Sequence, residues 1–268
     1  MRSSSILTTR PSLWGLRFLR YLRSWWYLVH LGAVALVTAF SPSTWNRANR
    51  LSTSRYIYVA AWQVIPWFTM LTALVGLVVI RIVLVTASSY GLSHFALEMV
   101  VRVLVLELLP LSAAMFAALR ASMAFDSAAL GLARSGVPTE AVSAEALRQL
   151  RRDLVPQVLA NAFAVLSLAM TSGTIVLLLA YVNVYGLSPW GLPEYTRTVG
   201  RIFEPIVAIG FALKTLLFGL AVALVPTAAI LELQRYPRRL LTPVQPGALR
   251  LLFVLMLIEA ASLAIKYI

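Results

Sequence analysis

The chain has 268 residues, of which 60% are hydrophobic and only 12% are charged, and its mean hydropathy is +0.83. A soluble protein of this length could not bury so much apolar surface, because charged residues normally make up about a quarter to a third of a soluble surface. Apolar stretches longer than about 18 residues recur along the chain, which is the pattern of membrane-spanning helices. The composition predicts an all-α integral membrane protein and excludes a soluble fold.

The formal net charge of +13 comes mainly from arginine, and the arginines cluster between the apolar stretches. The positive-inside rule produces this distribution, so we expect a lipid membrane and no nucleic acid as the partner. Because the chain contains no cysteine, disulfides, thiolate chemistry and Cys-ligated metals are excluded. The two histidines, His30 and His94, are far apart, and we interpret each as structural or interfacial.

The first 55 residues are predicted to form an N-terminal tail and an amphipathic interfacial helix or elbow. In PSLWGLRFLRYLRSWWYLVH, arginines fall on one side of a helix and aromatic residues on the other, which suits a helix lying at the membrane surface. The predicted interface residues are Arg17, Arg20, Arg23, Trp25 and Trp26. A signal peptide is the alternative, but no small-residue cleavage site follows the apolar run.

Residues 56–268 contain five longer apolar segments, at about 56–88, 97–133, 155–183, 203–231 and 248–268. Arginine-rich connectors alternate with connectors that are poorer in basic residues. The positive-inside rule then places the N-terminus in the cytoplasm and the C-terminus outside, after five spans. We expect a single domain over residues 1–268.

The basic connector at 134–153 contains a predicted short polar helix. Thr139 can cap this helix, and Pro138 marks its entry. Its charged residues are Glu140, Glu145, Arg148, Arg151 and Arg152. A cytoplasmic helix between two spans is what the permease of an ABC transporter inserts into a groove of its ATPase. A solvated helix without a partner fits the same spacing.

Several ionisable residues lie within the predicted spans, namely Arg81, Glu107, Lys214 and Glu259. A rise of about 1.5 Å per residue places the first three at a similar depth, with Glu259 near the same level. Charges inside a bilayer are costly and are usually paired or functional. They could form salt bridges that fix helix packing, a polar patch in a cavity for a charged or zwitterionic headgroup, or both. Glu98 and Arg102, spaced i, i+4, should form a surface ion pair.

No catalytic constellation accompanies these charges. Serine and threonine residues lack a histidine partner that could act as a base. The pair Lys214–Thr215 lacks the glycine that precedes it in a phosphate-binding loop. We therefore expect the chain to use no cofactor of its own and not to hydrolyse ATP, so that energy comes from a partner or a gradient.

Three stretches carry a family resemblance: LELLPLSAAMFAALRASMAFDSAALGLAR, DLVPQVLA and GFALKTLLFG. They resemble elements of the MlaE/YrbE permeases of MCE-type lipid ABC transport systems. The matching positions are Glu107, Pro110 and Arg120 in the second span, Pro156 at the start of the third, Lys214, Thr215, Phe218 and Gly219 in the fourth, and Glu259 in the last.

The resemblance covers about residues 12–266 and implies a permease subunit of the bacterial inner membrane. Such a subunit moves phospholipid or another lipid, so bound phospholipid is expected. The implied partners are a second permease copy or paralogue, a cytoplasmic ABC ATPase that uses ATP, a periplasmic MCE-domain protein and, in some systems, a STAS-domain protein.

The chain also departs from the family pattern. Leu106 stands where the family has arginine, Leu109 where it has glycine, and the glycine-rich element before the last span is missing. A degenerate, non-transporting assembly subunit that pairs with another permease is therefore an alternative. An intramembrane lipid-modifying enzyme using Glu107 and Arg120 is a further alternative, but it would need a nucleophile or a metal cluster.

Overall fold

The computed structural model describes residues 47–120, 139–235 and 246–267, together with isolated positions between 26 and 37. Within these residues, five helices are long and apolar enough to cross a membrane: Thr53–Ser89, Ser93–Arg120, Pro156–Tyr185, Pro205–Ala228 and Ala248–Ile265. The prediction of an all-α integral membrane protein with five spans is confirmed.

The first span is assembled from three helical pieces. Helix α2 (Arg47–Ile57) runs into a short π-helical turn, η2 (Tyr58–Trp62), and α3 (Ile65–Ser89) continues to the other end. Pro66 lies at the start of α3. A proline ring collides with the carbonyl four residues earlier, here that of Trp62, and a wider turn at that point relieves the collision.

The second span has the same construction. Helix α4 (Ser93–Met99) leads into the π-helix η3 (Val100–Leu108), and α-helix resumes over residues 109–120. Pro110 follows η3 directly, and its ring would meet the carbonyl of Leu106 in a regular α-helix. The turn between the first two spans contains Gly91, whose φ of 71° is a left-handed conformation suited to glycine.

The third span belongs to a much longer helix than the sequence predicted. Helix α6 (Thr139–Tyr185) has 47 residues and passes through Pro156 without ending. The polar segment at its start, predicted as a separate short helix, is therefore continuous with the span. Its residues are mostly strong helix formers such as Ala, Glu, Leu, Gln and Arg, and no glycine interrupts them before the span begins.

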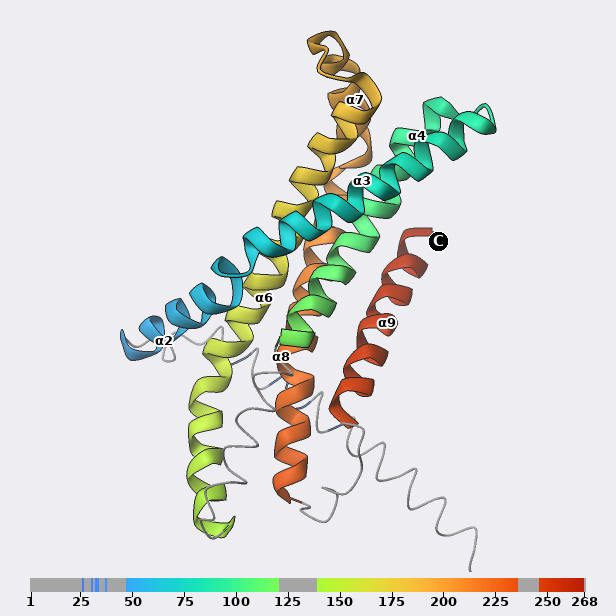
Figure 1. The fold of residues 1–268 in the computed structure, drawn as a ribbon. Helices are drawn as coiled ribbons and strands as arrows, with labels where there is room; N and C mark the ends of the chain where they lie inside the picture. The colour runs from blue at the N-terminus through green and yellow to red at the C-terminus, as the bar shows by residue number, and fades with distance from the viewer. Residues whose placement is uncertain are drawn as a thin grey trace, which may run out of the picture.

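The remaining helices complete the bundle. A 3₁₀ turn, η4 (Pro189–Gly191), leads to α7 (Leu192–Ile202), and the last spans are formed by α8 (Pro205–Arg235) and α9 (Pro246–Tyr267). In Figure 1, α6 and α8 run side by side, α3 crosses them obliquely and α9 lies along α8. Helix α7 stands at one end of the bundle, and the start of α6 lies at the opposite end.

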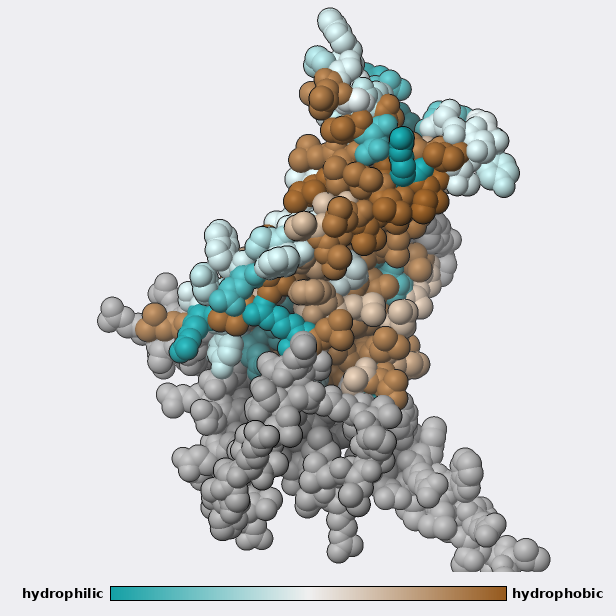
Figure 2. All heavy atoms as spheres, viewed as in Figure 1, coloured by the Kyte–Doolittle hydropathy of each residue, from teal (hydrophilic) through white to brown (hydrophobic). Residues whose placement is uncertain are grey.

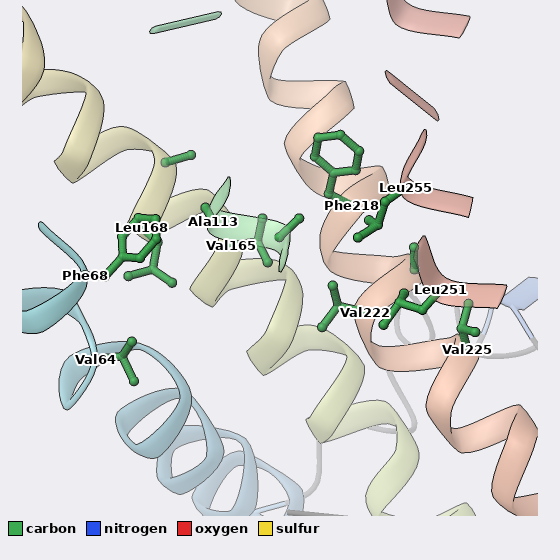
Figure 3. Packing of buried hydrophobic residues seen from close by; sticks show 13 residues of the cluster. Val64, Phe68, Ala113, Val165, Leu168, Phe218, Val222, Val225, Leu251 and Leu255 are labelled. Carbon is green, nitrogen blue, oxygen red and sulfur yellow. The ribbon is translucent and has the colours of Figure 1, made fainter. Parts of the chain in front are cut away.

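Two groups of buried apolar side chains hold the helices together. The first draws on all five spans and includes Phe68, Ala113, Val165, Phe218 and Leu255, whose side chains converge in Figure 3. The second lies nearer α7 and joins η3 to α3, α6 and α7. Between the charged ends, Figure 2 shows mostly brown apolar side chains on the outside of the described part, as expected for a lipid-facing surface.

Candidate functional site: an ionic cluster shared by three spans

A lysine lies on the packed face of α8. Lys214 starts a run of buried residues that continues with Thr215, Phe218, Gly219 and Val222, the 3.6-residue spacing of one helix face. Its side chain is only 3% exposed. Lys214 lies nine residues beyond Pro205, about 14 Å along the helix, so it cannot reach the end of the span by extending its side chain.

Two carboxylates from two other spans meet this lysine. The ammonium of Lys214 donates a hydrogen bond to Glu107 Oε2 of η3. Its Nζ also lies 2.8 Å from Glu259 Oε2 of α9. We call Glu107, Lys214 and Glu259 the ionic triad. It links the second, fourth and fifth spans, which come together only in the folded bundle.

The triad contains two carboxylates for one ammonium. Glu259 Oε2 is buried, and its described ion-pair partner is the ammonium of Lys214, which it shares with Glu107. The exposed fractions of the side chains are 14% for Glu107 and 12% for Glu259, so the carboxylates are more accessible than the ammonium. The ring of Phe218, with its centroid 5.8 Å from Nζ, covers one side of the ammonium.

The π-helix η3 carries Glu107 on the second span. The backbone N–H of Leu109 donates to the carbonyl of Leu104, five residues back, which is the spacing of a π-helix. Pro110 is buried and has no N–H to contribute. The proline that marked this motif in the sequence thus accounts for the wide turn around Glu107. Such π segments frequently occur at functional sites.

Arg81 does not join the triad. It lies on α3, is exposed and makes no ion pair within the described residues, whereas its neighbour Ile80 is fully buried. One residue along an α-helix turns the side chain by about 100°, so the packing of Ile80 directs Arg81 outward. The prediction from depth alone did not take this rotation into account. The predicted surface pair is confirmed, with Arg102 and Glu98 2.8 Å apart.

The other residues of the fourth-span motif pack the helices. Thr215 is fully buried, and its hydroxyl donates to carbonyls of its own helix, at 3.0 Å to Phe211 and 2.9 Å to Ala212. A Cβ on Gly219 would lie 2.3 Å from the Cα of Ala162 on α6. Glycine is therefore required at this close approach of α6 and α8.

Two further motif residues lie toward the α2 end of the bundle. Arg120, the last described residue of the second span, donates to the side-chain oxygen of Gln63 at 3.5 Å, a long bond between the first two spans. Pro156 is buried inside α6 and begins its apolar part. Neither residue contacts the triad through a described interaction.

The remaining predicted residues are described only in part. Arg17, Arg20, Arg23 and Trp25 lie outside the described residues, whereas Trp26 is helical and exposed. For the proposed coupling residues, the structure describes the helical backbone of α6 alone; these are Glu140, Glu145, Arg148, Arg151 and Arg152. Among the described residues, no group of three His, Cys, Asp or Glu side chains could hold a metal ion.

Helix α7 was not predicted from the sequence, in which its residues were assigned to a connector. Tyr195 donates to the carbonyl of Leu177 on α6 at 2.8 Å, and its ring packs against Tyr181 and Tyr185. Burial of the phenol, together with the nearby Tyr185, raises the pKa of Tyr195 to about 12. The helical spacing of Tyr195, Val199 and Ile202, with Pro193 in the first turn, was a signal for this helix.

Comparison with known proteins supplies the family. The chain matches no curated protein and no solved structure. A family model described as Permease MlaE matches residues 53–264, from the start of the first candidate span to within one residue of the end of the fifth. Because this match covers well over half of the sequence, the chain belongs to the MlaE permease family.

Proposed function

We propose that this permease moves phospholipid or another lipid between the bacterial inner membrane and a periplasmic MCE-domain protein. Family membership makes the chain a membrane permease subunit of a lipid ABC transporter, and hence a transport subunit rather than an enzyme. ATP is used by a cytoplasmic ABC ATPase bound to the permease. A second permease copy or a paralogue completes the membrane part, and a STAS-domain protein joins some complexes.

The ionic triad is the observation that carries this proposal. A lipid has apolar chains and a polar head, so a protein that moves it through the membrane needs an apolar wall with a few polar groups at depth. The described spans are largely apolar outside and packed inside, and Glu107, Lys214 and Glu259 bring three ionisable groups together within that packing. Ionisable groups at such depth are costly and commonly mark a substrate pathway.

The distribution of charge supports an orientation. The arginine-rich connectors favour a cytoplasmic location for the start of α6, and with it a periplasmic location for α7 and the C-terminus. The first turns of α6 would then face the ATPase. Their charged residues, from Glu140 to Arg152, are our candidates for coupling ATP hydrolysis to the spans.

One observation favours the alternative of a non-transporting assembly subunit. Leu106 is buried among apolar residues of η3 and α6, at a position where the family resemblance expects an arginine beside the glutamate. The polar character of the motif is therefore reduced. A degenerate permease would keep the packing residues, such as Phe218 and Gly219, and would have no need of the triad.

Purification of the chain from its native membrane in mild detergent, followed by mass spectrometry of proteins and lipids, tests the proposal. We expect an ABC ATPase, an MCE-domain protein and bound phospholipid to accompany the chain. Recovery of the chain with no ATPase would contradict the proposed function. Recovery of ATPase and a second, different permease without lipid would favour the assembly subunit.

A further inference from the structure

Arg81 lies on the lipid-facing side of the first span. It is exposed, and it is the only ionisable residue in the sequence of α3. The large apolar side chains around it on the same helix face are 43–59% exposed; these are Leu74, Leu77, Val78 and Val85. A surface of this kind faces acyl chains, which offer no acceptor to the five N–H donors of a guanidinium.

Exposed aromatic side chains mark where α3 meets the two membrane surfaces. Trp67 is 75% exposed and Tyr90 is 77% exposed, and such residues are enriched at membrane–water interfaces. They are 23 positions apart, about 35 Å along the helix, which is close to the thickness of the hydrocarbon core. Arg81 is nine positions from Tyr90, so it lies in the leaflet at that end.

The guanidinium of Arg81 can reach the headgroups of this leaflet. Nine residues correspond to about 13 Å along the helix, and the oblique course of α3 brings Arg81 closer to the surface than that (Figure 1). Long basic side chains near the ends of spans keep their charge at the interface while their stems stay in the apolar region.

No counter-charge for Arg81 comes from the described part of the chain, in which it has no ion-pair partner. Glu98 lies on the neighbouring second span, but it already pairs with Arg102 at 2.8 Å. Glu107 and Glu259 share the buried Lys214. At the edge of the hydrocarbon core, the nearest other acceptors are the phosphate groups of the lipids.

We propose that Arg81 holds the phosphate of a phospholipid on the outer surface of the first span, apart from the ionic triad. The planar guanidinium can donate to two phosphate oxygens at once, and the acyl chains would lie along Val78, Leu77 and Leu74. Phosphatidylglycerol suits this site better than phosphatidylethanolamine, whose own ammonium offsets the charge of its phosphate. The site does not depend on the proposed function, because it needs only a chain that spans a phospholipid bilayer.

The test uses the full chain reconstituted into vesicles of phosphatidylglycerol, phosphatidylethanolamine and diacylglycerol in equal parts. After extraction in mild detergent, native mass spectrometry identifies the retained lipid. We expect the wild type to hold one phosphatidylglycerol that Arg81→Gln retains about tenfold less, as the loss of one charge-assisted hydrogen bond would give. Arg81→Lys should fall between them, because an ammonium keeps the charge but not the planar fork.

Arg102→Gln is the matched control. Arg102 is also an exposed arginine, nine positions after the start of α4, but it has its own carboxylate in Glu98, so lipid retention should stay at the wild-type level. Because the Arg81 side chain is exposed, circular dichroism of the lipid-free chain should show Arg81→Gln folded like the wild type.

Three results would overturn the inference. One is equal retention of phosphatidylglycerol by the wild type and Arg81→Gln, or retention of diacylglycerol, which has no phosphate, at the same level. The second is a bound mass of inorganic phosphate in place of lipid. The third is a dimer that Arg81→Gln loses while lipid retention stays unchanged, since the counter-charge would then come from a second copy of the chain.

Discussion

Lys214 Nζ lies 2.8 Å from Glu259 Oε2 and donates a hydrogen bond to Glu107, so a single ammonium joins α8 to both α9 and the second span. Glu107 and Glu259 are 152 positions apart in the sequence, and Lys214 lies between them. Because two mostly buried carboxylates share this one cation, a change at Lys214 should affect three spans at once.

Replacement of Lys214 by Met should strongly destabilise the bundle. The substitution keeps a long side chain but leaves Glu107 and Glu259 without their shared cation. Removing one partner from a buried ion pair typically costs about 3–5 kcal/mol, because the other charge stays buried. Unfolding of the purified chain in detergent, followed by circular dichroism, measures the loss.

The triple variant Glu107→Gln, Lys214→Met, Glu259→Gln is the control for this prediction. It removes all three charges, so it should recover most of the lost stability. Arg81→Gln, on the exposed face of α3, should change the free energy of unfolding by no more than about 0.5 kcal/mol. A Lys214→Met variant as stable as the wild type would show that the triad does not stabilise the bundle.

Substitution of Glu107 by Gln should impair lipid movement more than assembly of the complex. The amide keeps the shape of the carboxylate, and Lys214 still has Glu259 as its ionic partner. We expect the ATPase to bind as in the wild type and lipid transfer in reconstituted vesicles to fall about tenfold, corresponding to one lost charged interaction. If the variant assembles and moves lipid at the wild-type rate, the triad is not part of the transport path.

Alanine at Gly219 should destabilise the contact between α6 and α8. Its Cβ would lie 2.3 Å from the Cα of Ala162, so the two helices would have to move apart, at a cost of about 1–3 kcal/mol. At Gly210, on the same helix, an added Cβ would meet no atom within 4 Å. Gly210→Ala should therefore be neutral or stabilise the helix by up to about 1 kcal/mol. Thermal unfolding of the two variants provides the comparison, and equal effects would contradict the close approach.

Removal of the Tyr195 hydroxyl should loosen α7. Tyr195→Phe loses the hydrogen bond to Leu177, worth about 1 kcal/mol, and amide hydrogen exchange should speed up along α7. Gly200→Ala, on the same helix with open space around its Cβ, should not speed it up. Unchanged exchange in Tyr195→Phe would mean that this bond does not hold α7 against α6.

The raised pKa of Tyr195 predicts a dependence on alkaline pH. The folded protein holds the phenol proton up to a pKa of about 12, above the ordinary value of 10.0. The contribution of Tyr195 to stability is therefore fully present below pH 10.0 and is lost as the pH rises toward 12. A titration of phenolate absorbance, wild type minus Tyr195→Phe, measures this group, and ionisation near pH 10.0 would contradict the burial of this phenol.

Much of the fold follows from apolar length and helix propensity, both of which are local properties. The five spans were predicted within a few residues at most ends, because each is an apolar stretch long enough to cross the bilayer. The predicted boundary that differs from the structure lies at the start of α6. The polar residues after Thr139 were assigned to a separate helix, but their strong helix propensity makes them continuous with α6.

The sequence predicts the depth of each ionisable residue of the candidate site, but not the direction of its side chain. Counting residues gave approximate depths for Arg81, Glu107 and Lys214, and depth is what a constant rise per residue determines. Depth does not say which way a side chain points or which spans are neighbours. Packing of Ile80 turned Arg81 away, and packing of α9 along α8 brought Glu259 to Lys214.

The sequence by itself determined that this protein is a membrane-spanning helical bundle with ionisable residues inside its spans, since hydropathy and charge are read along the chain. Only the tertiary structure decided that Glu107, Lys214 and Glu259 form one ionic cluster and that Arg81 does not belong to it. The physical reason is that contact between residues more than 40 positions apart depends on how helices rotate and pack. Close approaches such as that of Gly219 to Ala162 set this packing.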